Sequence, residues 1–424
     1  MQLGLNRPSK GTIFVVFTLI VLLTPVLMEI TGSGYAKLIE DAAYLIMIIY
    51  SIILLFKREY PTIRVRLTIV ALVFSFMLFV LIGIYYNGIF MIILQFRELK
   101  YLLLLIILLP YSNTEIFKGV WPTLKIIAAV NIPVSIIQWF LYSKTKIDSV
   151  TGIMGFRACG ILTFFALTVF FSELGIRLKE HKNVLGFYLL YLVPTALNET
   201  KITIILFPIM LFFTLVITKR LNFNVFISVF IIVALLFFGW SYMYKATNEY
   251  SVSDVFSLEY LENYMFSTEW IGDAGRMAKV LYALDIIGDD NLLFGYGLGA
   301  SYRGSTSGVD GYISNLFYTP EMFGGTRPQI FVSFIEIGVL GTIIITVILL
   351  VFFKKVLRIK KFSIEKLIST NLFIIVFASL LYQQIFYFYQ IMYLLLFYTI
   401  VCLRYNAIDV ENRDELGNLL IDCD

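Results

Sequence analysis

The sequence contains little charge: Lys, Arg, Asp and Glu make up 15% of its 424 residues, against about a quarter in soluble domains. Hydrophobic residues make up 59%, and the mean hydropathy is +0.87. A soluble fold cannot bury so much apolar surface, so the composition predicts a polytopic membrane protein. It excludes a secreted enzyme and a nucleic-acid-binding protein. The long apolar runs also exclude an outer-membrane barrel, whose strands alternate over short segments.

Cysteine and histidine are scarce as well. The three cysteines, Cys159, Cys402 and Cys423, give neither a disulfide framework nor a paired metal-binding spacing. The single histidine, His181, argues against a histidine-built metal centre. The first apolar run is not followed by a small-residue cleavage site, so we interpret it as an uncleaved first helix.

Twelve apolar stretches are candidates for helices that cross a bilayer, which needs about 20 residues. The predicted spans are residues 12–31, 38–56, 67–87, 98–112, 118–142, 158–176, 184–198, 201–218, 225–244, 329–353, 367–386 and 387–403. The predicted fold is therefore all-α, with a tight aromatic turn between the last two spans. The predicted divisions are helices 1–9 in residues 1–244, a large extracytoplasmic loop in 245–328, helices 10–12 in 329–403 and a tail in 404–424.

Lys and Arg concentrate in one set of loops, which includes residues 57–66, 177–182 and 354–366. Loops with this excess lie on the cytoplasmic side of a membrane. Both termini and His181 are therefore predicted to be cytoplasmic, and the loop 245–328 is predicted to lie on the outer face.

The large loop contains one amphipathic pattern. Residues 276–288 are predicted to form a helix capped by Asp273, with Arg276, Lys279 and Asp285 on its polar face. The apolar positions recur at helical spacing; they are Met277, Val280, Leu281, Leu284 and Ile287.

Glycines follow this helix in the sequence. The segment Gly295 to Gly299 lacks a preceding strand, so it is not a dinucleotide fingerprint, and we interpret it as a tight backbone turn. Residues 298–307, rich in Gly, Ser and Thr, are predicted to form a flexible loop.

Basic residues at the outer ends of several spans are candidates for binding an anion. Asn198 is expected to cap the helix at 201–218, with Lys201 in its first turn as an anion ligand. Each basic residue has an alternative interpretation: Arg157 as an interfacial anchor, Lys201 as a snorkelling lysine in a capped hairpin, and Arg276 as a solvated charge. Arg327, which directly precedes the tenth span, joins them. Three arginines and a lysine at one membrane face suit a large anion with a hydrophobic tail, such as a lipid diphosphate.

The tenth span contains a carboxylate within an apolar run. Glu336 lies nine residues after Arg327, about two and a half helical turns. We expect Glu336 to pair with a basic residue on another span. Gly338 and Gly341 are expected to allow close helix packing.

Four elements occur in a recognisable order: Arg157-Ala158-Cys159-Gly160-Ile161, Asn198 to Lys201, Arg276 to Gly299, and Arg327 to Gly341. Over about residues 60–400 this order resembles the O-antigen polymerase and ligase superfamily of bacterial envelope polysaccharide assembly. The resemblance implies a GT-C-like membrane glycosyltransferase of the bacterial inner membrane, working at its outer face without metal or cofactor. It implies undecaprenyl-diphosphate-linked oligosaccharide as substrate, and a chain-length regulator and a flippase as partners.

One departure from the family pattern favours a polymerase over a ligase. Ligases of the superfamily resemble one another in carrying a histidine nine residues before the Glu-x-Gly-x-x-Gly element, whereas this chain has Arg327 there. A ligase remains the alternative. A secondary transporter, which would need charges or broken helices near the midplane, and a non-enzymatic assembly protein are hypotheses from other classes.

Under the polymerase hypothesis, Arg157, Arg276 and Lys201 bind the diphosphate, and Arg327 binds the diphosphate or the donor sugar. Arginine cannot accept the proton of the incoming hydroxyl. The candidate bases are Glu321, Asp310 and Glu336, and a strongly dissociative transition state would need no strong base. Further candidates for substrate binding on the same segments are Glu199, Arg303, Gln329 and Tyr296, with Tyr302, Tyr312 and Tyr318 as sugar-stacking side chains.

Overall fold

The computed structural model describes residues 10–32, 35–56, 67–98, 114–142, 150–155, 159–182, 186–198, 200, 202–220, 227, 231, 234, 258–268, 274–302, 309–323, 327–359 and 362–384. These parts of the chain are helical and contain no strand, which confirms the predicted all-α class.

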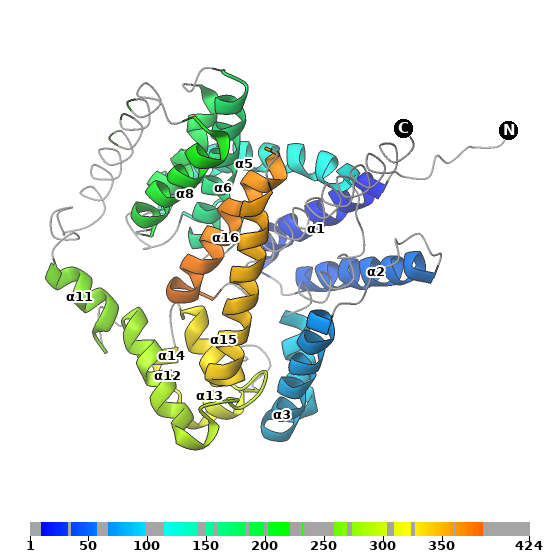
Figure 1. Ribbon diagram of the computed structural model, residues 1–424, viewed down its shortest axis with the longest axis vertical. Coiled ribbons are helices and arrows are strands. Elements are labelled where there is room, and N and C mark those ends of the chain that lie inside the picture. The colour runs from blue at the N-terminus through cyan, green and yellow to red at the C-terminus, as the bar shows by residue number, and fades with distance from the viewer. Residues whose placement is uncertain are drawn as a thin grey trace, which may run out of the picture.

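The helices fall into three groups along the chain (Figure 1). The N-terminal group is α1 (Lys10–Thr31), α2 (Ala36–Phe56), α3 (Leu67–Glu98) and α5 (Thr114–Tyr142). The central group is α6 (Cys159–Lys179), the 3₁₀ helix η1 (Phe187–Leu192), α7 (Val193–Leu197) and α8 (Thr203–Thr218). The last group is α11 (Leu258–Phe266), α12 (Arg276–Asn291), α13 (Tyr312–Phe317), α14 (Pro320–Phe323), α15 (Gln329–Arg358) and α16 (Ile364–Tyr382).

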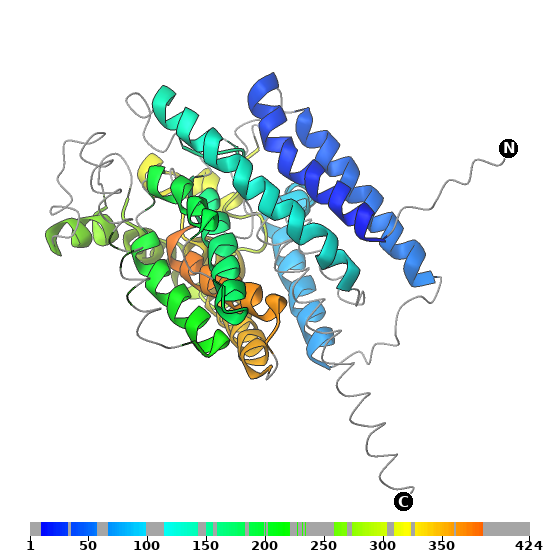
Figure 2. The ribbon, with the colours of Figure 1, turned by 90° about the horizontal axis from the view of Figure 1, so that it is seen from above.

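Helix α6 is the centre of the largest core. It is apolar on all sides, as expected of a helix surrounded by others, and Phe164, Phe165, Phe170 and Phe171 are fully buried. It packs against α5, α7, α8, α16 and η1. In two views α1 lies beside both α2 and α5, and α15 is paired with α16 (Figures 1 and 2).

Five helical segments of the described chain are long and apolar enough to cross a membrane, which makes this a membrane protein. They are Phe76–Arg97, Gly119–Leu141, Cys159–Lys179, Gln329–Arg358 and Ile364–Tyr382. The number twelve stays a prediction, because the spans predicted at 98–112, 225–244 and 387–403 lie wholly or mostly outside the described residues. Helix α16 ends at Tyr382 and Gln383 is its C-cap, four residues before the predicted end.

Residues 184–198 do not form the single long helix that was predicted there. The described part is η1 followed by the five-residue α7, with Pro194 in the first turn of α7. Together they extend about 20 Å, less than the roughly 30 Å of a hydrocarbon core. An apolar run of this length did not distinguish a spanning helix from two short buried ones.

Two of the long helices are interrupted at glycines. Gly88 in α3 has φ 78° and ψ 161°, and Gly338 in α15 has φ 65° and ψ −175°. The first part of α3 therefore ends where the predicted span 67–87 ends. In α15, residues 339–358 alone extend about 30 Å, which is sufficient to cross the hydrocarbon core.

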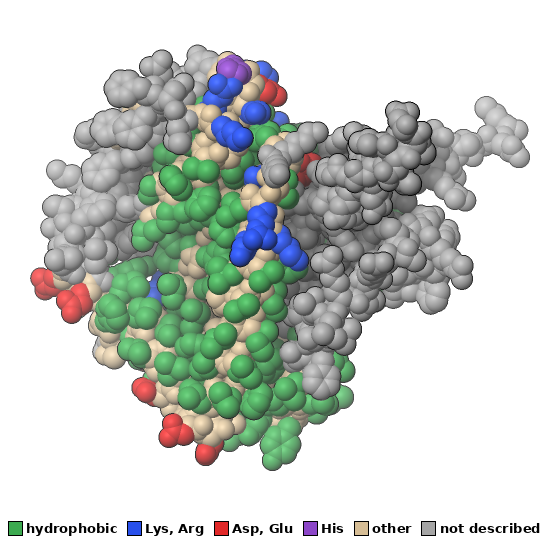
Figure 3. All heavy atoms as spheres, in the orientation of Figure 1, with side chains coloured by type: hydrophobic (Ala, Val, Ile, Leu, Met, Phe, Trp, Pro, Cys, Tyr) green, Lys and Arg blue, Asp and Glu red, His purple; other side chains and the backbone are tan. Residues whose placement is uncertain are grey.

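Charged side chains separate toward opposite ends of the helices. Most of the visible Lys and Arg side chains lie in the upper half of Figure 3, whereas Asp and Glu lie mainly along the lower and left edges, near α11 and α12. Lys179, Lys219 and Lys366 mark one end of α6, α8 and α16, which we call the lysine end. The orientation of this end in a membrane stays a prediction.

Candidate anion-binding site

Helix α12 presents its basic residues to the protein interior. The predicted helix is present, but Gly275 is its N-cap rather than Asp273, which lies outside the described residues. Lys279 is fully buried and Leu281 is 52% exposed, so the predicted assignment of Lys279 to a solvated polar face was wrong. The reason is tertiary: α12 packs along α15, and the side it turns inward carries Ala283 and Ile286 together with Lys279.

Arg276 contacts two aromatic rings. Its Cζ is 5.4 Å from the ring centroid of Tyr264 in α11 and 5.7 Å from that of Tyr382 in α16. Cation–π contacts with both rings restrict the guanidinium and orient its plane. Arg276 is thereby fixed at the last residue of α16.

Arg327 approaches the same segment from the start of α15. Its Nη1 donates to the carbonyl oxygen of Ser301 at 3.0 Å. Its Nη2 and Nε each donate to the side-chain oxygen of Gln384 at 3.2 Å, with the amide oriented by this network. Arg276 and Arg327 therefore contact the same short segment, residues 382–384. We call Arg276, Arg327 and residues 382–384 together the arginine end.

The start of α6 also reaches this segment. A Cβ on Gly160 would lie 2.5 Å from Nε2 of Gln383, so the helix start and the amide are in direct contact. Asn198, in the second element of the sequence pattern, is hydrogen-bonded to α6. Its Nδ2 donates to the Cys159 carbonyl at 2.9 Å and to Thr163 Oγ1 at 2.6 Å. The prediction that Asn198 caps α8 was wrong, because Ile202 is the N-cap.

The four elements of the sequence pattern thus lie around the end of α16. Arg157, Glu199, Lys201 and Arg303 themselves lie outside the described residues. Their roles stay predictions, and the described contacts are those of the neighbouring residues.

Glu336 is linked to Arg327 through a residue that sequence reasoning missed. The Glu336 side chain is 2% exposed. Its Oε1 accepts from Ser301 Oγ at 2.7 Å, and its Oε2 accepts from Gln95 Nε2 at 3.3 Å. Because the Ser301 carbonyl accepts from Arg327, Ser301 joins the arginine to the carboxylate. The donors of these two hydrogen bonds are neutral groups, and the pairing of Glu336 with a basic residue stays a prediction.

The glycine-rich segment is the predicted tight turn, inserted between α3 and α15. Gly297 has φ 78°, and a Cβ there would lie 2.0 Å from the backbone nitrogen of Gly83. Asn87 Nδ2 donates to the carbonyls of Tyr296 and Leu298 at 3.1 and 3.3 Å. The flexible loop predicted from Leu298 onward was wrong for the first residues, since Ala300 is fully buried.

The predicted close packing at Gly338 and Gly341 is confirmed. A Cβ on Gly338 would lie 2.3 Å from the Leu293 carbonyl oxygen, and one on Gly341 would lie 2.8 Å from Phe79 Cζ. The backbone N–H groups of Val339 and Leu340 donate to Leu292 and Leu293 at 2.9 and 3.2 Å. The break in α15 is therefore filled by the turn that follows α12.

The tyrosine and glutamine candidates are engaged with protein. Tyr296 and Tyr312 pack on each other and on Tyr86, with ring centroids 5.1 to 5.7 Å apart. Tyr318 packs on Phe323. Gln329 is 2% exposed, and its Nε2 donates to Ser333 Oγ within α15. Sugar stacking by these rings stays a prediction.

Glu321 is the candidate base that lies beside the start of α12. Its carbonyl accepts from the backbone N–H of Ala274 at 3.1 Å, two residues before Arg276. Its half-buried carboxylate forms no hydrogen bond or ion pair in the part of the chain that the structure describes. Asp310 is exposed.

Three contributors to the site were not predicted. Lys279 could have been found from its spacing, because it lies one helical turn after Arg276 and so on the same side of the helix. Gln384 follows an apolar span and was interpreted only as part of a turn. Ser301 has no distinguishing sequence signal.

Comparisons with known proteins do not assign the chain to a family: no family model matches it, and no curated protein or solved structure matches it. The described geometry and the residue pattern are therefore the basis for inferring its function.

Proposed function

We propose that this protein is a membrane-embedded polysaccharide polymerase that uses an oligosaccharide on a lipid diphosphate as donor. The observation that carries the proposal is the convergence of Arg276 and Arg327 on residues 382–384. They come from the starts of different helices. Lys279, buried one turn after Arg276, adds a third positive charge on the same side of α12.

This arrangement suits a diphosphate better than a single carboxylate. A guanidinium presents planar, paired donors that match phosphate oxygens, and its charge persists at every physiological pH. Two such groups held by protein contacts are preorganised for the negative charge that develops as a diphosphate leaves. The rings of Tyr264 and Tyr382 and the amide of Gln384 provide that support.

The proposed reaction is a direct displacement at the anomeric carbon of the donor. The acceptor hydroxyl oxygen forms the new C–O bond, the bond to the diphosphate oxygen breaks, and the diphosphate leaves with the electron pair. The hydroxyl proton goes to a carboxylate, for which we favour Glu321 because of its position beside α12. Glu336 already accepts two hydrogen bonds in the interior and is assigned a positioning role.

The charge distribution supports one orientation of this site in the membrane. By the excess of Lys and Arg at the lysine end, that end faces the cytoplasm. The arginine end then faces outward, and residues 339–358 cross the hydrocarbon core and leave Glu336 beyond it. This is the face at which the resemblance expects lipid-linked repeat units to be joined.

Helix breaks at Gly88 and Gly338 are the observation that favours a secondary transporter instead. In such proteins the groups freed by a break bind the transported ion. At Gly338 the N–H groups of Val339 and Leu340, and the carbonyl of Ile335, are hydrogen-bonded to the turn after α12. The Gly338 break is thus used for packing, which supports the polymerase.

The test is deletion of the gene in its native cell, followed by complementation with wild type, Arg276→Ala or Arg358→Ala. Arg358 is the matched control, an exposed arginine at the opposite end of α15. Surface glycan is then resolved on a gel. We expect single repeat units after deletion, and long chains with wild type and Arg358→Ala but not with Arg276→Ala.

Each other outcome identifies a competitor. Long chains stranded on the lipid carrier, with bare acceptor, would identify a ligase. Loss of all glycan at the cell surface, with repeat units retained inside, would identify a transporter. Restoration of the ladder by Arg276→Ala would show that polymerisation does not require the arginine end.

A further inference from the structure

A second basic site lies at the lysine end. A cavity of about 330 Å³ opens between the ends of α6, α8, α15 and α16. Lys179, Lys219 and Lys366 line it together with the apolar side chains of Phe213, Leu357 and Phe362. The cavity is at the other end of α6 and α16 from the arginine end and takes no part in the proposed reaction.

The three lysines come from three different helix ends. Lys179 ends α6, Lys219 is the C-cap of α8 in a left-handed conformation, and Lys366 lies in the first turn of α16. Lys366 is only 9% exposed, and its Nζ donates to the Ile359 carbonyl. An ammonium has three N–H donors, so two remain for a ligand. The Nζ of Lys179 lies over the ring of Phe362.

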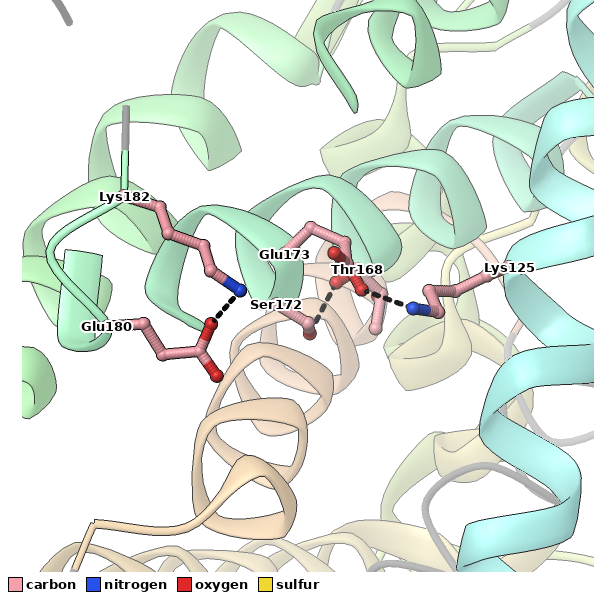
Figure 4. Close-up of polar contacts among 6 residues, drawn as sticks. All are labelled: Lys125, Thr168, Ser172, Glu173, Glu180 and Lys182. Atoms are coloured by element: carbon pink, nitrogen blue, oxygen red, sulfur yellow. Dashed lines mark hydrogen bonds and ion pairs between the residues drawn. The ribbon is translucent and has the colours of Figure 1, made fainter. Parts of the chain in front are cut away.

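In the part of the chain that the structure describes, acidic side chains near this end form no ion pair with the three lysines. Glu180 is paired with Lys182 at 2.6 Å and Glu173 with Lys125 at 3.1 Å, as Figure 4 shows. Glu365, next to Lys366, forms no ion pair in the described part of the chain. Three like charges around one cavity repel one another, so the site is incomplete without an anion.

We propose that this cavity binds the phosphate headgroup of an acidic phospholipid. The positive charges of the lysines complement the negative phosphate, and the phenyl and leucyl side chains offer apolar contacts to the first carbons of the acyl chains. Basic cavities between membrane helices bind anionic headgroups in this way, and a lysine near an anionic membrane surface contributes about fivefold in affinity. A free phosphate would use the lysines but not the apolar walls.

The test is native mass spectrometry of the purified full-length chain in detergent, titrated with phosphatidylglycerol, phosphatidylcholine or glycerol phosphate. We expect phosphatidylglycerol to bind in preference to the other two. The double variant Lys179→Gln/Lys219→Asn should weaken that binding about 25-fold. Both side chains are exposed, and asparagine tolerates the left-handed conformation at position 219, so the variant should fold.

The matched control is Lys354→Gln/Lys355→Gln, which removes two exposed charges from the same end but outside the cavity. It should bind phosphatidylglycerol like wild type. Equal weakening in the control would show general surface attraction and overturn the proposal. Equal binding of phosphatidylcholine, or equally tight binding of glycerol phosphate, would overturn it as well.

Discussion

Each end of the helices contains a cluster of basic residues, and the two clusters are constructed differently. At the arginine end, the guanidinium of Arg276 contacts two rings and that of Arg327 is hydrogen-bonded to Ser301 and Gln384. At the lysine end, Lys179 and Lys219 are exposed on long flexible side chains. Fixed planar groups suit a reaction whose charge develops at defined atoms, whereas mobile point charges suit a headgroup that need only be retained.

Exchange of the two cation types is the strongest test of this difference. Arg276→Lys keeps the charge but loses the planar contacts with Tyr264 and Tyr382, so we expect polymerisation to fall about a hundredfold. Lys179→Arg is the mirror change and should leave lipid binding unchanged. The measurements are the glycan ladder at limiting expression and lipid binding of the purified chain. An intact ladder with Arg276→Lys would show that charge alone suffices.

The sequence predicted the existence of α12 but not its orientation. The apolar repeat is real, since Val280 and Ile287 are buried. However, counting Lys279 as solvent-facing rotated the predicted buried face, which left Leu281 inward when it is half exposed. Hydropathy predicts that a lysine is exposed, whereas the burial of Lys279 follows from the packing of α12 along α15.

Convergence of the site could be predicted only in outline. The charge pattern placed Arg276 and Arg327 at one membrane face, but it contains no information on which helix ends are neighbours. The roles of Gln383 and Gln384 depend on tertiary contacts, since Gly160 contacts Gln383 and Arg327 donates to Gln384. A glycine-rich segment predicts a turn from its own residues, whereas Gly83, its packing partner, is an ordinary helix residue in the sequence.

The glycine turn is expected to support the arginine end. The loss of stability on substitution of Gly297 can be compared with the loss on substitution of a matched glycine. Gly297 and Gly288 both have positive φ, but a Cβ at 297 would meet Gly83 at 2.0 Å whereas one at 288 meets nothing within 4 Å. Gly288→Ala should cost about 1–3 kcal/mol from backbone strain alone, because a φ of 61° with a ψ of −177° is adopted almost only by glycine. Gly297→Ala should cost about 2 kcal/mol more, from overpacking.

Thermal unfolding of the purified protein in detergent gives this comparison directly. A midpoint lowered more by Gly297→Ala than by Gly288→Ala supports the close contact with α3. Equal losses would mean that the turn does not depend on Gly83, and the rigid support of Ser301 and Arg327 would then have to come from elsewhere.

The smallest expected effect is that of a substitution at Glu336, which distinguishes a positioning role of this carboxylate from a role as general base. Glu336→Gln keeps an oxygen for Ser301 Oγ. The new amide can face Gln95, whose Oε1 has no hydrogen-bond partner in the described structure. Because a neutral acceptor can hold Ser301, and through it Arg327, we expect polymerisation to fall by less than about tenfold. Glu321→Gln, which removes the proposed base, should cost more. If the ladder is lost with Glu336→Gln and retained with Glu321→Gln, the buried carboxylate is the base and the arginine end extends into the protein as far as Gln95.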